Sequence, residues 1–545
     1  MDYLSLCLIC KDENDYLSEW LDYHILMGVD RFYIYDNESR VSLRETLKDY
    51  IERGWVVVSD IPGKAMQLYA YDHCLQTFGA NTFWLGFIDT DEFLVPKTGQ
   101  GLKELLKDYE AYGGLAISSL FFGSNRHTTR PSVGQIAAYT WRTHATFKDN
   151  ELIKSIVQPG LALMPYSPHD FIFKENFWCV NENLLRVDMQ DFPNHVEKIQ
   201  LNHYFCRSER EIELKLRRGN SGDITWPRKR FDVVNRLATI KDVSIFQNLE
   251  TLFNGSEIDR TCLMELPESA GLLEKMAALA RIRRPTLLEF SLPSEMTFRI
   301  EVTTFLDIEV QFKAVKARGD FEEIKRWILK KIQISPQRST LYTDLAICCL
   351  NLKEPSNAWQ ALTQAWQFAP NSYSVLFGMA YYFLGIKNFA MAENTCRLLL
   401  EMAPHNLTVL GLLTETMLGQ GRYDEALKVG TPVVELSAQV GELPERMSIF
   451  LVKKMADYLL EKKDYPGAVR LWEAGVRCKP GDVNAILELS QALLRNGDKA
   501  GARQRLAEAQ RLEPQNETVL ALLRTDVSST KRVGPSLPAT PKRIH

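Results

Sequence analysis

The sequence lacks the features that mark a membrane or secreted protein. No stretch approaches the roughly eighteen uninterrupted apolar residues that a membrane-spanning helix needs. The first ten residues carry no basic leader, and their apolar run ends at Lys11-Asp12-Glu13, so we do not expect them to act as a signal peptide. The ten cysteines show no framework spacing, which favours free thiols in a reducing compartment. We therefore expect a cytoplasmic protein with no transmembrane segment.

An excess of charge of either sign is also missing. Lysine and arginine number 65 against 69 for aspartate and glutamate, and the formal net charge is -4. So small a charge argues against a protein that coats nucleic acid. The content of 45% hydrophobic and 25% charged residues is that of an ordinary globular protein. Because 545 residues exceed what one hydrophobic core holds, two or more domains are expected.

A repeat with a period of 34 residues fills the C-terminal half. This period is typical of the tetratricopeptide repeat (TPR), in which each unit folds as two helices and a small residue lets them approach closely. The residues that keep the period are the prolines Pro336, Pro370, Pro404, Pro480 and Pro514 and the small residues Ala358, Ala392, Ala426, Ala468 and Ala502. The sequence therefore predicts an all-α TPR solenoid.

The repeats define the predicted domain boundaries. About six units occupy residues 302–514, with an insertion near residues 437–446 where the register lengthens. Residues 1–250 are expected to form a separate domain and residues 251–301 a helical linker. Residues 515–545, rich in Ser, Pro, Lys and Arg, are expected to be a disordered basic tail. The array either supports its neighbour or offers a concave groove to a partner protein.

Residues 1–250 alternate apolar β-type runs with helical segments, as in an α/β domain with a largely parallel sheet. Strands are expected at 4–9, 31–35, 55–58 and 82–88, and a helix at 15–27 that ends before Gly28. Ligands of open α/β sheets bind at the carboxyl ends of the strands. We therefore expect the functional site where these strands end.

The strand at 82–88 leads into Asp89-Thr90-Asp91. Buried carboxylates are costly to ionise unless a cation or a donor compensates them, so this pair predicts a divalent cation site. Hard oxygen ligands suit Mn²⁺ or Mg²⁺, and such an ion can also bind a diphosphate. The alternative is a turn in which Asp89 or Asp91 caps the next helix.

Further motifs follow one another in order between residues 4 and 222. They are Lys11-Asp12-Glu13, Glu19-Trp20-Leu21-Asp22-Tyr23-His24, Phe32-Tyr33-Ile34-Tyr35-Asp36-Asn37, Gln67, Tyr71-Asp72-His73-Cys74-Leu75, Lys154-Ser155-Ile156-Val157-Gln158-Pro159 and Leu201-Asn202-His203-Tyr204-Phe205, with Ser208, Lys215, Arg218 and Gly219 after the last. Together with the aspartates, this set resembles glycosyltransferase family 92 and its bacterial family-2-like relatives. The resemblance implies the GT-A fold, a Rossmann-like α/β domain that binds a nucleotide-diphospho-sugar. Asp12 departs from the family, which usually has asparagine there.

The resemblance implies a metal site and a donor site. Asp89 and Asp91 would hold the metal, with His203 as the third ligand because a neutral imidazole binds Mn²⁺. His169 is the rival ligand, and His203 could instead be a hydrogen-bonded core histidine. The residues that would bind the nucleotide sugar are Glu13, Asp36, Gln67, Asp89, Lys154, Lys215 and Arg218. The alternatives are a cap or turn for Glu13 and Asp36 and an exposed basic helix face for Lys215 to Arg218.

The resemblance also implies transfer with inversion, in which a carboxylate deprotonates the acceptor hydroxyl. Asp170 is the candidate base, and Asp91 is the other catalytic residue. Glu92 and Asp223 are alternatives for the base.

We therefore expect a metal-dependent glycosyltransferase of the hexosyltransferase class, EC 2.4. It would move a sugar from a UDP-linked donor to a glycan, lipid-linked or protein acceptor, with Mn²⁺ or Mg²⁺ as cofactor and the repeats recruiting the acceptor or a protein partner. Donor hydrolysis would then survive removal of the chain after residue 300. The alternative is a catalytically inactive GT-A/TPR interaction scaffold. A nucleotidyltransferase is disfavoured, because no glycine-rich basic phosphate loop follows the first strand.

Overall fold

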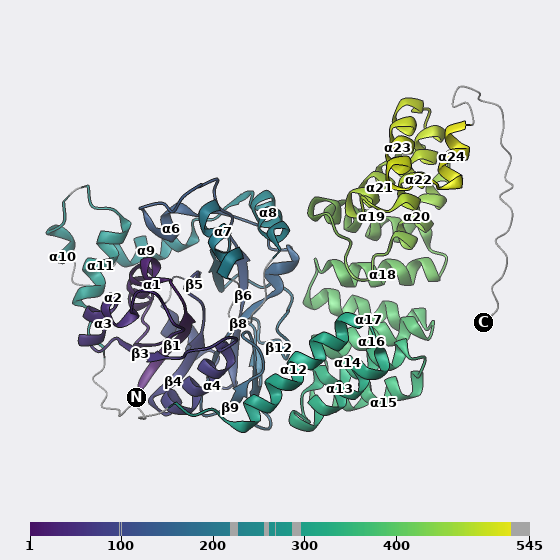
Figure 1. Cartoon of the computed structure of the whole chain (residues 1–545). Helices are drawn as coiled ribbons and strands as arrows, with labels where there is room; N and C mark the ends of the chain where they lie inside the picture. The colour runs from purple at the N-terminus through teal and green to yellow at the C-terminus, as the bar shows by residue number, and fades with distance from the viewer. Residues whose placement is uncertain are drawn as a thin grey trace. The chain divides into compact units, whose positions relative to one another are not determined.

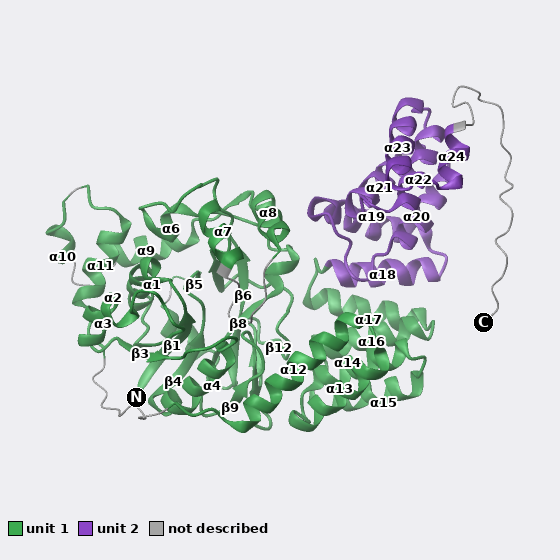
Figure 2. Cartoon of the chain, in the orientation of Figure 1, with its two compact units in different colours: residues 1–406 green, residues 407–545 purple. Residues whose placement is uncertain are grey.

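The computed structural model describes residues 1–97, 99, 101–218, 227–254, 261–267, 269–285 and 296–524. The chain divides into two compact units, residues 1–406 and residues 407–545 (Figure 2). The first unit contains the α/β domain and also the first helices of the repeat array. Among the helices of these described ranges, none is long and apolar enough to cross a membrane.

A mixed sheet forms the α/β domain, with strand order β12-β11-β6-β8-β4-β1-β2-β3 and with β13 pairing to both β5 and β6 (Figure 1). The strands are β1 (Asp2–Cys10), β2 (Arg31–Asp36), β3 (Val56–Asp60), β4 (Thr82–Phe87), β5 (Glu92–Pro96), β6 (Gly114–Phe121), β8 (Ile153–Val157), β11 (Cys179–Val180), β12 (Arg186–Val187) and β13 (Ile199–His203). The four strands expected from the sequence are confirmed and run parallel. Beyond β4 the sheet is mixed: β8 runs antiparallel between β4 and β6, whereas β11 and β13 pair parallel with β6.

The first helix, α1 (Asn14–Leu26), packs its apolar face on the sheet. Leu17, Trp20 and Leu21 are fully buried, and the Trp20 indole donates to the Glu92 carbonyl over 2.9 Å. The helix ends before Gly28, whose φ of 98° lies in the left-handed region that glycine enters most easily. The predicted helix and its glycine stop are therefore confirmed.

The predicted linker contributes to the core of the α/β domain. It contains the short helix α10 (Thr261–Met264), and α11 (Leu272–Ile282) packs against α1 with Met276 and Leu279 fully buried. The Arg53 guanidinium donates to the Arg281 carbonyl over 2.8 Å. The sequence did not reveal this docking, because an amphipathic helix does not specify which surface covers its apolar face.

The repeat array consists of paired helices. They are α12 (Ile300–Arg318), α13 (Phe321–Ile334), α14 (Ser339–Asn351), α15 (Pro355–Phe368), α16 (Tyr373–Gly385), α17 (Phe389–Met402), α18 (Leu407–Gly419), α19 (Tyr423–Val440), α20 (Ile449–Glu461), α21 (Tyr465–Cys478), α22 (Val483–Arg495) and α23 (Lys499–Leu512). The five alanines of the repeat are all fully buried, as close helix packing requires. Each repeat proline stands two residues after a helix end, at α13, α15, α17, α21 and α23.

Two irregular parts of the array refine the predicted boundaries. The insertion lies where α19 runs for 18 residues and stops at Gly441, whose φ is 87°. An additional helix, α24 (Glu517–Arg524), lies inside the segment expected to be disordered, because Val519 is fully buried next to α23. Residues 525–545 of the predicted tail lie outside the described residues.

Candidate active site

Asp89-Thr90-Asp91 lies at the carboxyl end of β4, at the point where the strand order reverses. β1 pairs with β2 on one side and with β4 on the other, so the crevice between their ends is the usual ligand site of an open α/β sheet. β5 begins at Glu92, directly after the second aspartate. Its partner β13 runs antiparallel and brings His203 opposite Glu92. The sheet thus gathers residues from distant parts of the sequence around the two aspartates.

Asp89 is held by Lys154 and Gln67. The Lys154 ammonium lies 2.8 Å from Oδ2, and the Gln67 amide donates to Oδ1 over 3.3 Å. Lys154 is almost fully buried, at the start of the antiparallel strand β8, which runs back past the end of β4. Burial lowers the pKa of Lys154, but Asp89 and Glu92 raise it well above its usual value. Lys154 is therefore a fixed positive charge beside Asp89.

Asp91 faces a second lysine and a histidine. The Lys215 ammonium lies 2.6 Å from Oδ2, and the His203 Nε2 lies 3.8 Å from Oδ1. Burial raises the pKa of Asp91, but Lys215 and the other positive neighbours, including Arg207, together hold that pKa below its usual value. Lys215 also donates to the Phe205 carbonyl and is only 14% exposed. The alternative of an exposed basic helix face is therefore wrong for Lys215.

Burial keeps both candidate histidines neutral. It lowers the pKa of His203 to about 4 and that of His169 to about 4. The His169 Nδ1 donates to the Ile153 carbonyl over 2.8 Å, which fixes the ring beside β8. His203 makes no contact closer than 3.8 Å with the carboxylates of Asp91 and Glu92. Of the two, His203 is the histidine whose ring nitrogen faces Asp91.

Arg207 is a site residue that the sequence analysis missed. Its guanidinium is almost fully buried, lies 2.6 Å from the Glu13 carboxylate and stacks over the Tyr16 ring at 3.9 Å. Glu13 also accepts a hydrogen bond from the Thr90 hydroxyl over 3.2 Å. These contacts tie the end of β1 to the aspartate turn. Arg207 follows the His203-Tyr204-Phe205 motif by two residues, and that proximity was the signal available in the sequence.

The charged residues of the candidate site lie within a region of the chain that matches a known family. Two carboxylates, the buried Lys154, the partly buried Lys215 and a neutral histidine surround the carboxyl end of β4. Residues 3–231 match the family model of glycosyltransferase family 92. The resemblance seen in the sequence is therefore confirmed for the N-terminal domain. A tetratricopeptide repeat model matches residues 459–525.

Relatives of the family 92 region support the same assignment. The chain is 32% identical over 185 residues to a glycosyltransferase family 92 protein of Oryza sativa, covering 33% of this chain and 31% of that protein. It is 29% identical over 186 residues to a family 92 protein of Arabidopsis thaliana, covering 32% of each. The chain thus spans about a third of the length of these relatives. A solved structure of Pseudomonas aeruginosa pilF covers 41% of this chain and 99% of its own at 16% identity, with a TM-score of only 0.32.

Two residues predicted for the site, Asp36 and Asp170, bind other parts of the chain. The Asp36 carboxylate accepts from the backbone of Ser39 over 2.9 Å and of Leu43 over 3.4 Å, so it stabilises a turn. Asp170 is buried and forms an ion pair with Arg338 of the repeats, which argues against its role as the base. The Arg218 side chain and the whole of Asp223 lie outside the described residues.

The predicted metal ligands come together only in part. Asp91 and His203 face each other, but both oxygens of Asp89 have protein partners in Lys154 and Gln67. Within the described ranges, no group of three or more His, Cys, Asp and Glu side chains is arranged to hold a metal ion. A pair of protein ligands still fits Mg²⁺ or Mn²⁺, because such ions are commonly held by one or two side chains plus substrate phosphates.

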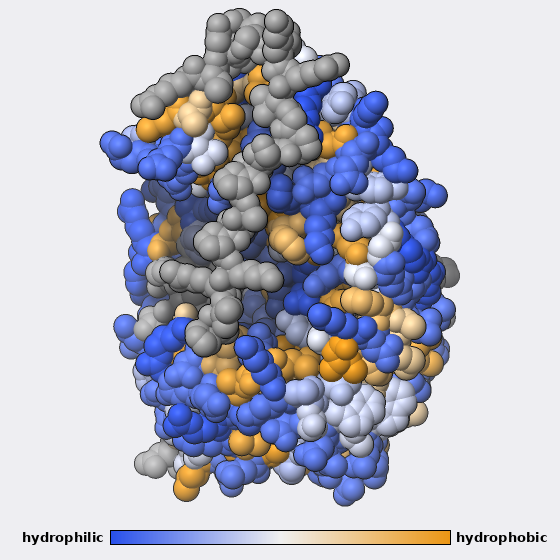
Figure 3. All heavy atoms as spheres, turned by 90° about the vertical axis from the view of Figure 1, so that its right-hand side faces the viewer, coloured by the Kyte–Doolittle hydropathy of each residue, from blue (hydrophilic) through white to orange (hydrophobic). Residues whose placement is uncertain are grey.

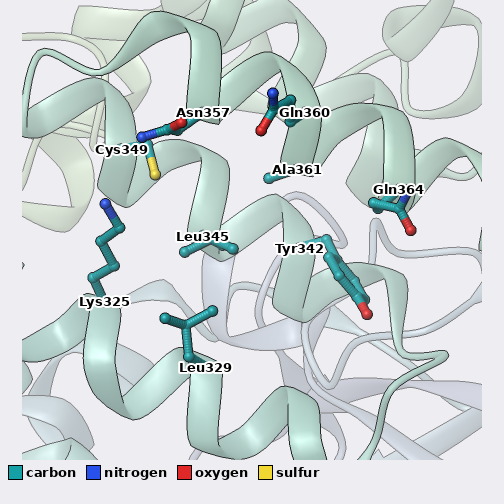
Figure 4. Close-up of a pocket in the computed structure, with 9 residues that line it drawn as sticks. All are labelled: Lys325, Leu329, Tyr342, Leu345, Cys349, Asn357, Gln360, Ala361 and Gln364. Carbon is teal, nitrogen blue, oxygen red and sulfur yellow. The ribbon is translucent and has the colours of Figure 1, made fainter.

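The repeats contain an open hollow of about 280 Å³ between α13, α14 and α15 (Figure 4). Its lining is mixed in character and consists of Lys325, Leu329, Tyr342, Leu345, Cys349, Asn357, Gln360, Ala361 and Gln364. On the face of the molecule drawn in Figure 3, hydrophilic side chains predominate and hydrophobic ones form separate patches. This hollow uses no residue of the candidate active site.

Proposed function

We propose that this protein is a glycosyltransferase that moves a sugar from a nucleotide-sugar donor to an acceptor hydroxyl. The observation that carries the proposal is the aspartate pair at the reversal point of the sheet, paired with two lysines within the region that matches family 92. Ammonium groups bind phosphate oxygens strongly, so the crevice suits a diphosphate. A UDP-linked donor and inversion of the sugar follow from the resemblance to the family.

Arg207 adds support for an anionic ligand. Its Nη2 atom is buried and has no hydrogen-bond partner within the described part of the chain. An unpaired buried donor is costly, and a phosphate oxygen of the substrate would compensate it. Arg207, Lys154 and Lys215 would then surround the diphosphate, while Glu13 holds Arg207 in place.

We propose that a divalent cation, Mn²⁺ or Mg²⁺, binds between Asp91 and His203. The neutral His203 ring and the ionised Asp91 are in the protonation states that a metal requires. Phosphate oxygens of the donor would complete the coordination. When bound, the ion would neutralise negative charge on the departing nucleotide. Asp89 would act next to it by holding Lys154.

The repeats are proposed to recruit the acceptor, a glycan, lipid-linked or protein molecule, or a partner protein. The hollow between α13, α14 and α15 supports this, because it combines apolar and amide side chains in one concave surface.

Glu92, an alternative for the base, is almost fully buried and accepts from the Asp89 backbone over 2.8 Å. This contact gives Glu92 a structural part in shaping the turn.

The decisive experiment measures release of nucleotide from a panel of nucleotide sugars with and without Mn²⁺. Asp91→Asn should lower turnover by about a hundredfold or more, since it removes an ionised group from the reacting centre. Asp60→Asn is the matched control, because Asp60 also ends a strand but pairs with Arg44 at the surface. Equal turnover of Asp91→Asn and the wild type would refute the role of Asp91. A wild type that hydrolyses no donor would favour the inactive scaffold.

A further inference from the structure

We infer that Arg338, a residue of the repeat array, is a positioning residue for the active site of the α/β domain. Through Asp170 it holds the turn that fixes Lys154 beside Asp89. The repeats α12 to α14 are on this view part of the catalytic scaffold and not only a recruitment module. The inference rests on the proposed function, since it concerns the same site.

The contact between the repeats and the turn is buried and specific. Arg338, just before α14, forms an ion pair with Asp170, and the two side chains are only 10% and 8% exposed. The guanidinium also stacks over the Tyr166 ring, with its central carbon 3.6 Å from the ring centroid. The other Asp170 oxygen accepts from the Ser167 hydroxyl. The turn at 166–170, which joins β9 (Ala162–Pro165) to β10 (Phe171–Phe173), is thus closed around the Arg338 side chain.

From this turn, two hydrogen bonds lead to the strand that carries Lys154. The Ser155 hydroxyl donates to the His169 carbonyl over 2.6 Å, and the His169 ring donates to the Ile153 carbonyl over 2.8 Å. Ile153 and Ser155 flank Lys154 in β8. The Lys154 ammonium lies 2.8 Å from Asp89. A displacement of the turn would therefore move both neighbours of Lys154.

A second contact anchors the same region from the other side. Arg299, just before α12, binds the carboxylate of Asp72 in α4 (Gln67–Phe78), with Nε 3.0 Å from Oδ2, and donates to the Leu163 carbonyl over 2.7 Å. An apolar cluster of Met164, Val302 and Phe305 lies beside it. Figure 1 shows α12 next to β9 and α4. Because α4 begins at Gln67, which binds Asp89, the repeats support both side chains that hold this aspartate.

The substitution Arg338→Lys would keep the positive charge but lose the planar shape of the guanidinium. The planar guanidinium of arginine can stack on Tyr166 while it binds Asp170, whereas an ammonium is a compact point charge. Small displacements at a reacting centre have large effects on rate and binding. We therefore expect a graded series in which Arg338→Lys retains part of the function that Arg338→Met loses.

The test uses the full chain and the nucleotide sugar that the wild type hydrolyses. Arg338→Met should raise the KM for the donor by about tenfold, and Arg338→Lys by less. A smaller folded fraction lowers the apparent kcat but leaves KM unchanged, so KM separates positioning from mere stability. Arg186→Met is the matched control at the same interface, because the Arg186 guanidinium donates to the Phe368 carbonyl over 2.8 Å but does not contact the 166–170 turn. Its KM should equal that of the wild type.

The outcomes separate this inference from the proposed function. A wild type without turnover on any donor would contradict both. An active wild type with the same KM in Arg338→Met and Arg186→Met would overturn the positioning role and leave the proposed function intact. If Arg338→Met does not fold, Arg338→Lys and Asp170→Asn decide the matter, because both keep a polar partner in the buried pair; a wild-type KM in both would overturn the inference.

Discussion

The two halves of the repeat array share one sequence period but differ in what surrounds them. In the first half, polar side chains near helix starts bind the α/β domain: Ser339 and Ser374 donate to Asp188, and Asn406, between α17 and α18, donates to Glu151 over 3.0 Å. Residues at helix starts also cap their own helices in both halves, as Ser372 and Asn388 do in the first half and Asp464 and Asp498 in the second. The first half belongs to the same compact unit as the α/β domain, and the second half forms a unit of its own.

The internal packing of the repeats is the same whether or not they dock on the α/β domain. The small residues between helices are fully buried in both halves, as at Ala392 and Ala502. What separates the halves is a handful of outward-facing side chains, notably Arg299 and Arg338. The helices of the first half thus dock on the α/β domain, whereas the second half keeps the same internal packing in a separate unit.

The largest expected effect comes from truncation. A chain of residues 1–406 keeps every contact of the first unit and should retain donor hydrolysis. A chain that ends at residue 298 loses Arg299, Arg338 and the apolar cluster, and its hydrolysis should fall by more than about tenfold. This is the reverse of the expectation from the sequence that hydrolysis survives removal after residue 300. The rate of donor hydrolysis per folded molecule tests this expectation. Equal rates for the two chains would show that the first half of the array does not support the active site.

Loss of one ion pair should matter more in the first half than in the second. Arg299→Met leaves the nearly buried Asp72 without its partner, so we expect a loss of about 2 kcal/mol, reduced by the partial exposure of Arg299. Arg505→Met removes a surface pair with Glu508 and should cost about 0.5 kcal/mol or less. Urea unfolding of each full-length variant gives both values. Similar losses would mean that the ion pair with the α/β domain adds no more to the free energy of unfolding than a surface ion pair does.

Overpacking should affect both halves alike. Ala392→Leu in α17 and Ala502→Leu in α23 each force extra volume between two packed helices, at a cost of about 1–3 kcal/mol. The expected equality follows from the shared internal packing of the repeat. Thermal unfolding of the two variants tests it, and a strongly unequal pair would show that docking also changes the packing within a repeat.

The smallest expected effect is a pH dependence that is confined to the first unit. Burial raises the pKa of Glu19 to about 7 from the usual 4.5, although two backbone amides donate to its carboxylate. The folded protein therefore binds more protons than the unfolded chain between these pKa values, and this group makes stability fall as the pH rises from 4.5 to 7. The wild type should lose stability on the order of 1 kcal/mol between pH 5 and 7 through this group, and Glu19→Gln should abolish that loss. The exposed Glu461→Gln is the control, and an unchanged pH slope in Glu19→Gln would contradict the assignment.

Much of the candidate site could be read from the sequence, because its residues stand at strand ends or in recognisable motifs. Asp89 and Asp91 follow an apolar strand, and Gln67, Lys154, His203 and Lys215 lie in motifs that resemble the family. The structure brings these residues around one turn. Arg207 was missed, because a single arginine after a motif carries no periodic or compositional signal.

By itself, the sequence determined the helices of the repeats and the first four strands, because periodicity and strand ends are local properties of the chain. Only the tertiary structure decided the partners: β8 between β4 and β6, α11 on α1, and Arg338 on Asp170. It also showed that Asp170, the candidate base, pairs with Arg338 of the repeats and that Asp36 binds the backbone of a turn. The physical reason is that a charged or apolar side chain specifies the kind of partner it needs, whereas the identity of that partner depends on how distant segments pack.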